Sequence, residues 1–296
     1  MSWLELKIAL GNLDPQKIED ALLEAGALSV TLQDGGDEPL YEPDPLKPPL
    51  WSDTRMTALF AADADMDGVR AYLLANLGLK HLPVHQVEPL QDRDWAREWL
   101  KDFKPMRFGK RLWVCPTAFT PPDPSAVNLL LDPGLAFGTG THATTALCLE
   151  WLDGTDLKDC GVIDYGCGSG ILSIAAARLG AKYVLAVDHD PQALTATRDN
   201  ALRNGVEHRI RVSPPDALPD NHAEVLLANI LAGPLVKLAP LFARRLKSGG
   251  RLVLSGILES QEQELREAYG PHFDSFETTK REDWLRITAI RRPGHV

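Results

Sequence analysis

The sequence has little cysteine and no long apolar run. Its four cysteines among 296 residues form no C-x-x-C pair, which predicts reduced thiols in a cytoplasmic protein and no metal site. No stretch is apolar over the length of a membrane-spanning helix, so no membrane association is expected. The first residues lack a basic segment followed by an apolar core, so no signal peptide is predicted.

Negative charge is unevenly distributed along the chain, whose net charge is −10. Residues 1–90 hold 15 acidic and 6 basic side chains, a balance of −9, whereas residues 91–296 hold 26 and 25, a balance of −1. An acidic first third repels nucleic acid and attracts a basic partner. A general solubility charge is the alternative.

The length suits two domains. In residues 1–90 the apolar pattern predicts the order β-α-β-β-α-β, which is typical of a smaller ferredoxin-like α+β domain. Residues 91–104 predict a linker helix with three aromatic side chains on one face, Trp95, Trp99 and Phe103. Residues 105–296 alternate between predicted strands and helices.

This alternation predicts a second, larger domain. Strands are expected at 111–115, 127–131, 162–165, 183–188, 209–213, 224–228 and 251–256. Helices are expected at 143–152, 170–179, 191–203, 233–246 and 259–268, followed by a hairpin within 276–290. The pattern is typical of a doubly wound, mostly parallel α/β sheet of the Rossmann-like kind, with seven strands. Ligands bind such sheets at the carboxyl ends of the strands.

A glycine-rich turn follows one of the buried strands. Residues 164–170 read D-x-G-x-G-x-G and lead directly into an apolar helix, so backbone amides can cradle a nucleotide-like ligand. The spacing differs from the G-x-G-x-x-G of dinucleotide-binding proteins. A strand-to-helix turn without a ligand is the alternative.

Asp188 ends the next predicted strand, 22 residues after Gly166. A carboxylate at this distance can accept hydrogen bonds from both hydroxyls of a ribose. The alternative is that Asp188 caps the following helix. Asp190, directly before Pro191, is better placed for that cap and would leave Asp188 free.

Two further segments place polar groups at the start of a predicted helix and at the end of a predicted strand. Residues 131–145 form a loop entering a helix, whose first amides can bind a carboxylate. His142 in this loop has no evident partner, which favours a structural role. Asn229 ends a predicted strand, where its carboxamide can accept a hydrogen from an amine without adding charge. The alternative is an ordinary polar residue at a turn.

Three motifs resemble those of the ribosomal protein L11 methyltransferase family. They are DPGLAFGTGTHATT at 132–145, DYGCGSG at 164–170 and NILAGPL at 229–235, and the resemblance covers essentially the whole chain. It implies S-adenosylmethionine as cofactor, a substrate-recognition domain (1–90), a linker helix (91–104) and a catalytic domain (105–296). It also implies methylation of lysine ε-amines and an N-terminal α-amine of ribosomal protein L11, to the trimethyl state. A monomer is expected.

The resemblance assigns roles residue by residue. Asn229 is the expected catalytic residue, which holds the target amine. The residues expected to contact the cofactor or frame its methyl group are Phe137, Thr144, Thr145, Asp164, Gly166, Gly168, Asp188 and Asn229.

Three other functions are alternatives. A nucleic-acid base amino-methyltransferase usually places an aromatic side chain three residues after the asparagine to stack a flipped base, and Ala232 stands there. The glycine spacing disfavours a nicotinamide dehydrogenase. A non-catalytic ribosome-assembly protein is compatible with the sequence, although Gly166, Asp188 and Asn229 are intact.

Overall fold

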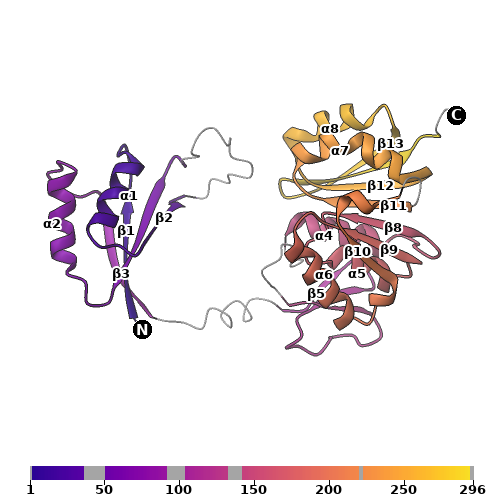
Figure 1. Cartoon of the computed structure of the whole chain (residues 1–296), viewed down its shortest axis with the longest axis horizontal. Coiled ribbons are helices and arrows are strands. Elements are labelled where there is room, and N and C mark those ends of the chain that lie inside the picture. The colour runs from indigo at the N-terminus through magenta and orange to yellow at the C-terminus, as the bar shows by residue number, and fades with distance from the viewer. Residues whose placement is uncertain (1, 37–50, 92–103, 133–141, 220–222, 294–296) are drawn as a thin grey trace. The chain divides into compact units, whose positions relative to one another are not determined.

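A computed structural model describes residues 2–36, 51–91, 104–132, 142–219 and 223–293 (Figure 1). The chain divides into two compact units, residues 1–98 and 99–296. Residues 92–103 of the predicted linker helix (91–104) and Phe137 lie outside the described residues. Within the described ranges, no helix is long and apolar enough to cross a membrane.

The N-terminal unit is a four-stranded antiparallel sheet with the order β2-β3-β1-β4. Its elements are β1 (Ser2–Ala9), α1 (Pro15–Glu24), β2 (Ser29–Asp34), β3 (Thr54–Ala61), α2 (Met66–Asn76) and β4 (His85–Gln91). This chain order and sheet order are those of the predicted ferredoxin-like fold.

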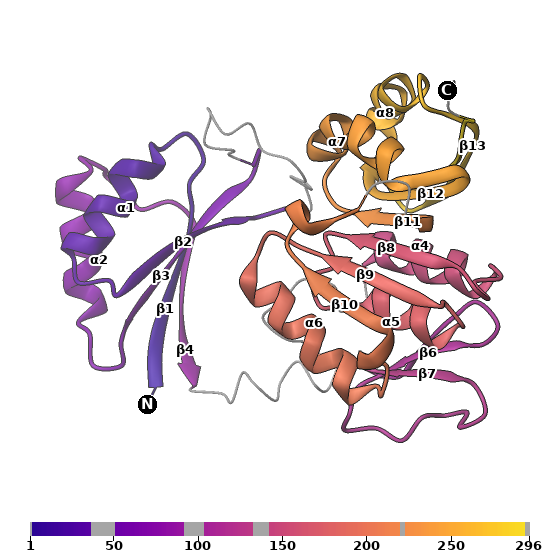
Figure 2. The same ribbon diagram turned by 45° about the vertical axis from the view of Figure 1, so that its right-hand side comes forward.

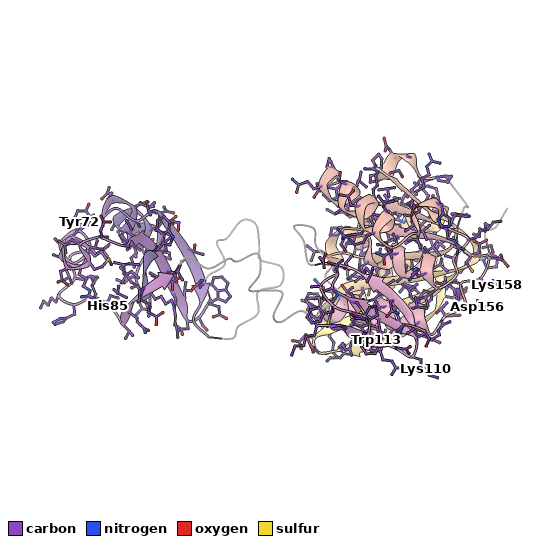
Figure 3. All side chains as sticks on the ribbon, turned by 90° about the horizontal axis from the view of Figure 1, so that it is seen from below. Tyr72, His85, Lys110, Trp113, Asp156 and Lys158 are labelled. Atoms are coloured by element: carbon purple, nitrogen blue, oxygen red, sulfur yellow. The ribbon has the colours of Figure 1, made fainter. Side chains whose placement is uncertain are left out.

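Alternation along β1 explains how this unit closes its core. Leu6 and Ile8 are buried and pack in one cluster with Ile18 and Leu22 of α1, whereas Lys7 between them faces the other side. Across the two helices, Tyr72 of α2, labelled in Figure 3, donates its hydroxyl to Glu24 Oε2 at 2.7 Å. The helices therefore cover one face of the sheet.

The C-terminal unit contains a seven-stranded sheet with the order β10-β9-β8-β11-β12-β14-β13. Its strands are β8 (Gly161–Tyr165), β9 (Tyr183–Val187), β10 (Ile210–Ser213), β11 (Ala223–Asn229), β12 (Leu246–Leu258), β13 (Phe273–Arg281) and β14 (Trp284–Arg291). The first five in sheet order run parallel, and β14 is antiparallel to both β12 and β13. The predicted mostly parallel, doubly wound sheet is confirmed.

Helices cover both faces of this sheet. They are α4 (Ala143–Asp153), α5 (Ile171–Arg178), α6 (Pro191–Arg203), α7 (Ala232–Arg245) and α8 (Glu262–Tyr269). One core cluster includes Leu149, Ile174 and Leu194 from α4, α5 and α6, and a second includes Phe242 and Tyr269 from α7 and α8. Figure 2 shows α7 and α8 together on one side of the sheet, in orange and yellow.

A separate three-stranded sheet precedes α4. It consists of β5 (Met106–Phe108), β6 (Leu112–Cys115) and β7 (Val127–Leu130), of which β5 had not been predicted. The buried carboxylate of Asp153, at the end of α4, accepts the backbone N–H of Lys110 (2.6 Å) and of Arg111 (3.1 Å). Lys110 is labelled in Figure 3. These hydrogen bonds connect the small sheet to the C-terminal end of α4, the helix whose first turn lies at the candidate site.

Candidate active site

The candidate site forms where three neighbouring parallel strands end. β11, β8 and β9 lie side by side, with Ala228 opposite Tyr165 and Tyr165 opposite Val187. The residues that follow these register positions are Asn229, Gly166 and Asp188. Parallel pairing therefore brings three predicted site residues to one edge of the sheet.

The glycine turn has a backbone that requires glycine. Gly166, Gly168 and Gly170 have φ values of +80°, +53° and +80°, in the left-handed region. A Cβ at Gly166 would lie 2.3 Å from Cγ2 of Ile230, which leaves no room for a side chain. The turn is tied to β9 because the N–H of Gly166 donates to the carbonyl of Val187 at 2.7 Å.

Asp188 connects this turn to the start of α6. Its carboxylate is buried and accepts the N–H of Gly168 through Oδ2 and the N–H of Asp190 through Oδ1, both at 3.0 Å. Asp188 is therefore free of the α6 cap, as predicted, although it has two local backbone partners. A carboxylate has about four acceptor sites, so capacity for ribose hydroxyls remains. Asp190 caps α6 as predicted and accepts the N–H of Gln192 at 2.8 Å.

Two α6 side chains that had not been predicted hold the turn from the other side. Thr197 donates its hydroxyl to the carbonyl of Gly168 at 3.0 Å, and Asn200 donates its amide to the carbonyl of Ser169 at 2.9 Å. Both residues are buried. They stand on the apolar stripe of helix 191–203, and a polar residue at such a position is the signal that could have identified them.

Asp164, in β8 directly before this turn, is buried in the interior of the C-terminal unit. It is 1% exposed, and its Oδ2 accepts the hydroxyl of Ser173 on α5 at 2.6 Å. Burial raises the pKa of Asp164 to about 6. The structure directs this side chain to α5, where it anchors the turn to the helix. Burial also raises the pKa of the Cys167 thiol to about 12, so this cysteine is not a thiolate at neutral pH.

The beginning of α4 forms the opposite wall. His142 is the N-cap: its Nδ1 accepts the N–H of Thr144 and lies 2.8 Å from the Thr144 hydroxyl. Its ring packs edge-on against Trp284 of β14, with ring centroids 4.9 Å apart. These contacts explain His142 as a structural residue and fix the first turn of α4, where Thr144 and Thr145 are buried.

Asn229 and Thr145 meet across the site. The Asn229 Nδ2 donates to the Thr145 Oγ1 at 3.2 Å, which joins the end of β11 to the first turn of α4. Leu231, two residues after Asn229, is half-exposed, and Ala232 is buried at the start of α7.

These residues fit S-adenosylmethionine. A Cβ at Gly166 or Gly170 of the glycine cradle would lie closer than 3.0 Å to a neighbouring side chain, Asp188 can accept from ribose hydroxyls, and the first amides of α5 follow Gly170 without a side-chain cap. No group of three or more histidine, cysteine or acidic side chains that could hold a metal ion is found within the described residues.

The fold and this site define an S-adenosylmethionine-dependent methyltransferase. The family model for ribosomal protein L11 methyltransferases matches residues 2–292. The chain therefore belongs to the ribosomal protein L11 methyltransferase family, as the motifs had indicated.

Individual relatives agree with this family. The ribosomal protein L11 methyltransferase of Pseudomonas paraeruginosa is 55% identical over 293 residues, which is 99% of each chain. That of Azotobacter vinelandii is 54% identical over 99% of this chain and 100% of its own. A crystal structure of ribosomal protein L11 methylase from Lactobacillus delbrueckii subsp. bulgaricus matches with a TM-score of 0.59 and 32% identity, over 64% of this chain and 100% of that one.

Proposed function

We propose that this chain methylates ribosomal protein L11 on lysine ε-amines and on the N-terminal α-amine, to the trimethyl state, as a monomer in the cytoplasm. The observation that supports this most is Asn229, held by Thr145 at the strand edge that also carries the glycine cradle and Asp188. The substrate named for its relatives is ribosomal protein L11.

Cofactor binding is assigned to the residues around the glycine turn and the start of α4. Gly166 and Gly168 provide the backbone cradle, Asp188 the ribose contact, and Thr144, Thr145 and Asn229 the wall near the methyl group. Phe137 is assigned beside the cofactor, and Asp164 supports the turn through Ser173. S-adenosylmethionine supplies a sulfonium methyl, and as the amine lone pair bonds to that carbon the C–S electron pair stays on sulfur.

For methyl transfer, the protein must favour the neutral form of the target amine and hold it in the right orientation. A lysine amine has an ordinary pKa near ~10.4, so at neutral pH it is mostly a cation without a free lone pair. Desolvation lowers such a pKa by up to ~3–5 units on full burial, and half-exposed Leu231 offers an apolar neighbour. The ammonium proton leaves to solvent, and Asn229 holds a remaining N–H.

Substrate recognition is assigned to residues 1–90, with 91–104 as the linker and 105–296 as the catalytic domain. The balance of −9 on residues 1–90 complements a basic ribosomal protein. It also disfavours direct recognition of nucleic acid. Ala232, buried within α7, is not available to stack on a flipped base, which argues against the base amino-methyltransferase.

The experiment incubates the full chain with ribosomal protein L11, ribosomal RNA and S-adenosylmethionine that carries a deuterated methyl group. Mass spectrometry should find labelled methyl groups on L11 amines, up to three on each. Label on ribosomal RNA instead would favour base methylation. Binding of L11 with no transfer to any acceptor would favour the non-catalytic assembly protein.

A further inference from the structure

The contact between Thr145 and Asn229 determines which end of the Asn229 carboxamide is available. Nδ2 donates to the Thr145 hydroxyl at 3.2 Å, so the amide nitrogen faces α4, and Oδ1 has no hydrogen bond to another residue in the described part of the chain. Without this bond the carboxamide could turn over and present N–H groups in place of the oxygen. Only the oxygen can accept a hydrogen from an amine.

Thr145 is well placed to enforce this choice. It is 3% exposed in the first turn of α4, and that turn is fixed by the His142 cap and the packing of His142 on Trp284. Threonine in a helix divides between two χ1 rotamers, and the contact at 3.2 Å corresponds to the one that directs the hydroxyl at Asn229. In this rotamer the Thr145 hydroxyl is the acceptor for the Asn229 amide.

Resting on the proposed function, we propose that Thr145 is a positioning residue that orients the Asn229 carboxamide so that its oxygen holds an N–H of the acceptor amine. The held N–H aims the nitrogen lone pair at the methyl group. A carboxamide in the opposite orientation would donate an N–H to that lone pair and occupy the electrons that must form the new bond.

This role has a consequence for successive methyl transfers. The neutral amine that attacks carries two N–H bonds in the first transfer, one in the second and none in the third. Each of the first two products is an ammonium that releases one proton to solvent before the next attack, and the third product is quaternary and releases none. Asn229 can therefore orient the acceptor in the first two transfers but has no hydrogen to hold in the third.

The test compares single-turnover transfer by the full chain to three forms of ribosomal protein L11, with unmodified, monomethylated and dimethylated amines. Thr145→Val keeps the side-chain shape and removes the hydroxyl, and Thr145→Ser restores it. We expect Thr145→Val to slow transfer to unmodified and monomethylated amines about tenfold, the value of one hydrogen bond of about 1.4 kcal/mol. Transfer to dimethylated amines should stay within about twofold of wild type, and Thr145→Ser should resemble wild type on all three.

Two further readouts separate positioning from structural damage. The side-chain amide NMR signal of Asn229 in the ligand-free protein, assigned by its loss in Asn229→Ala, should shift in Thr145→Val and return in Thr145→Ser. Calorimetry should show an unchanged affinity for S-adenosylmethionine. Thr155→Val is the matched control, because it removes a hydroxyl that donates to the Trp151 carbonyl at 2.7 Å at the other end of α4.

Equal slowing on all three acceptors, or an unmoved amide signal, would overturn the proposal, as would equal slowing by Thr155→Val. Wild type that methylates no L11 amine at all would overturn the proposed function instead, and the amide signal would still report on the contact. Wild type that stops at dimethylated amines would contradict the trimethyl state alone, and the unmodified and monomethylated acceptors would then decide the role of Thr145.

Discussion

The two units of this chain differ in how many polar side chains they bury. The described residues of the N-terminal unit bury one polar side chain, Thr54, whereas those of the C-terminal unit bury twelve. Eight of the twelve lie in or around the candidate site: Thr144, Thr145, Asp164, Ser169, Ser173, Asp188, Thr197 and Asn200. The N-terminal unit instead displays acidic side chains around an apolar core.

This difference indicates that the C-terminal unit carries out chemistry and cofactor binding and that the N-terminal unit recognises the substrate. Burying a polar group is costly unless it is hydrogen-bonded, so a cluster of bonded, buried polar groups marks a place where geometry is fixed for chemistry. Exposed acids without such a network contribute through their long-range field, which steers a basic partner. We therefore expect C-terminal changes to alter chemistry or cofactor binding, and N-terminal changes to alter recognition.

The largest effect of a single substitution is expected at Asn229. Asn229→Ala should reduce turnover on ribosomal protein L11 about a hundredfold, because orientation of the amine is lost. Affinity for S-adenosylmethionine should change little. Single-turnover transfer at saturating cofactor, with calorimetry in parallel, measures both. Wild-type turnover in this variant would show that Asn229 does not orient the acceptor.

Asn229→Asp examines the charge at the same position. A carboxylate stabilises the ammonium form and raises its pKa, so transfer at pH 7 should be slow and should recover in part at higher pH. Wild-type activity should also rise with pH through the neutral range, since only the neutral amine attacks. Rate profiles against pH for both proteins check this, and identical profiles would contradict it.

Asp188 should affect the cofactor and not the acceptor. Asp188→Ala removes charge-assisted hydrogen bonds worth roughly 1.5–3 kcal/mol, which corresponds to a weakening of S-adenosylmethionine binding by about tenfold to a hundredfold. Asp188→Asn keeps an acceptor for the Gly168 N–H and serves as the control for the turn itself. If folded Asp188→Ala protein binds S-adenosylmethionine with unchanged affinity, Asp188 does not bind the ribose.

Sequence patterns were sufficient for the strands that build the site. β8, β9 and β11 lie within one residue of their predicted bounds, because buried parallel strands are continuous apolar runs with sharp ends. β5 was missed because it has three residues and an exposed arginine, Arg107, at its centre. No local pattern marks so short a strand.

Contacts within the site were less accessible to sequence reasoning. Thr145 and Asn229 were both candidates, but they are 84 residues apart, and their hydrogen bond depends on how α4 packs beside β11. The interior orientation of Asp164 likewise depends on Ser173 of the next helix. The sequence predicts which residues reach the edge of the sheet, whereas tertiary packing decides which of them face each other.

A smaller effect, on stability, is expected from Asp164. Burial raises its pKa in the folded state from 3.8 to about 6, so the folded protein holds this proton more tightly than the unfolded chain. The stabilisation is complete below about pH 4 and is lost as the pH rises through about 6. Relative to Asp164→Asn, wild type should lose on the order of 3 kcal/mol across this window. Urea unfolding at several pH values measures the difference, and a constant difference would contradict it.

The smallest effect is expected on the surface of the N-terminal unit. Glu19 is half-buried and Asp20 is exposed on α1, and the combined Glu19→Gln and Asp20→Asn variant should raise KM for L11 a few-fold at low salt, with kcat unchanged. The matched control is the C-terminal pair Glu264→Gln and Glu267→Gln on α8, which should leave KM unchanged. Equal effects of both pairs would indicate that net charge alone matters.

The assignment of cofactor binding and substrate recognition to different units is tested most directly by a chain that begins at Leu90. Its affinity for S-adenosylmethionine, measured by calorimetry, should equal that of the full chain, whereas its transfer to ribosomal protein L11 should be lost. Loss of cofactor binding as well would show that the two units do not work separately. Methylation of L11 at the full-chain rate would contradict the account, because recognition would then lie in the C-terminal unit.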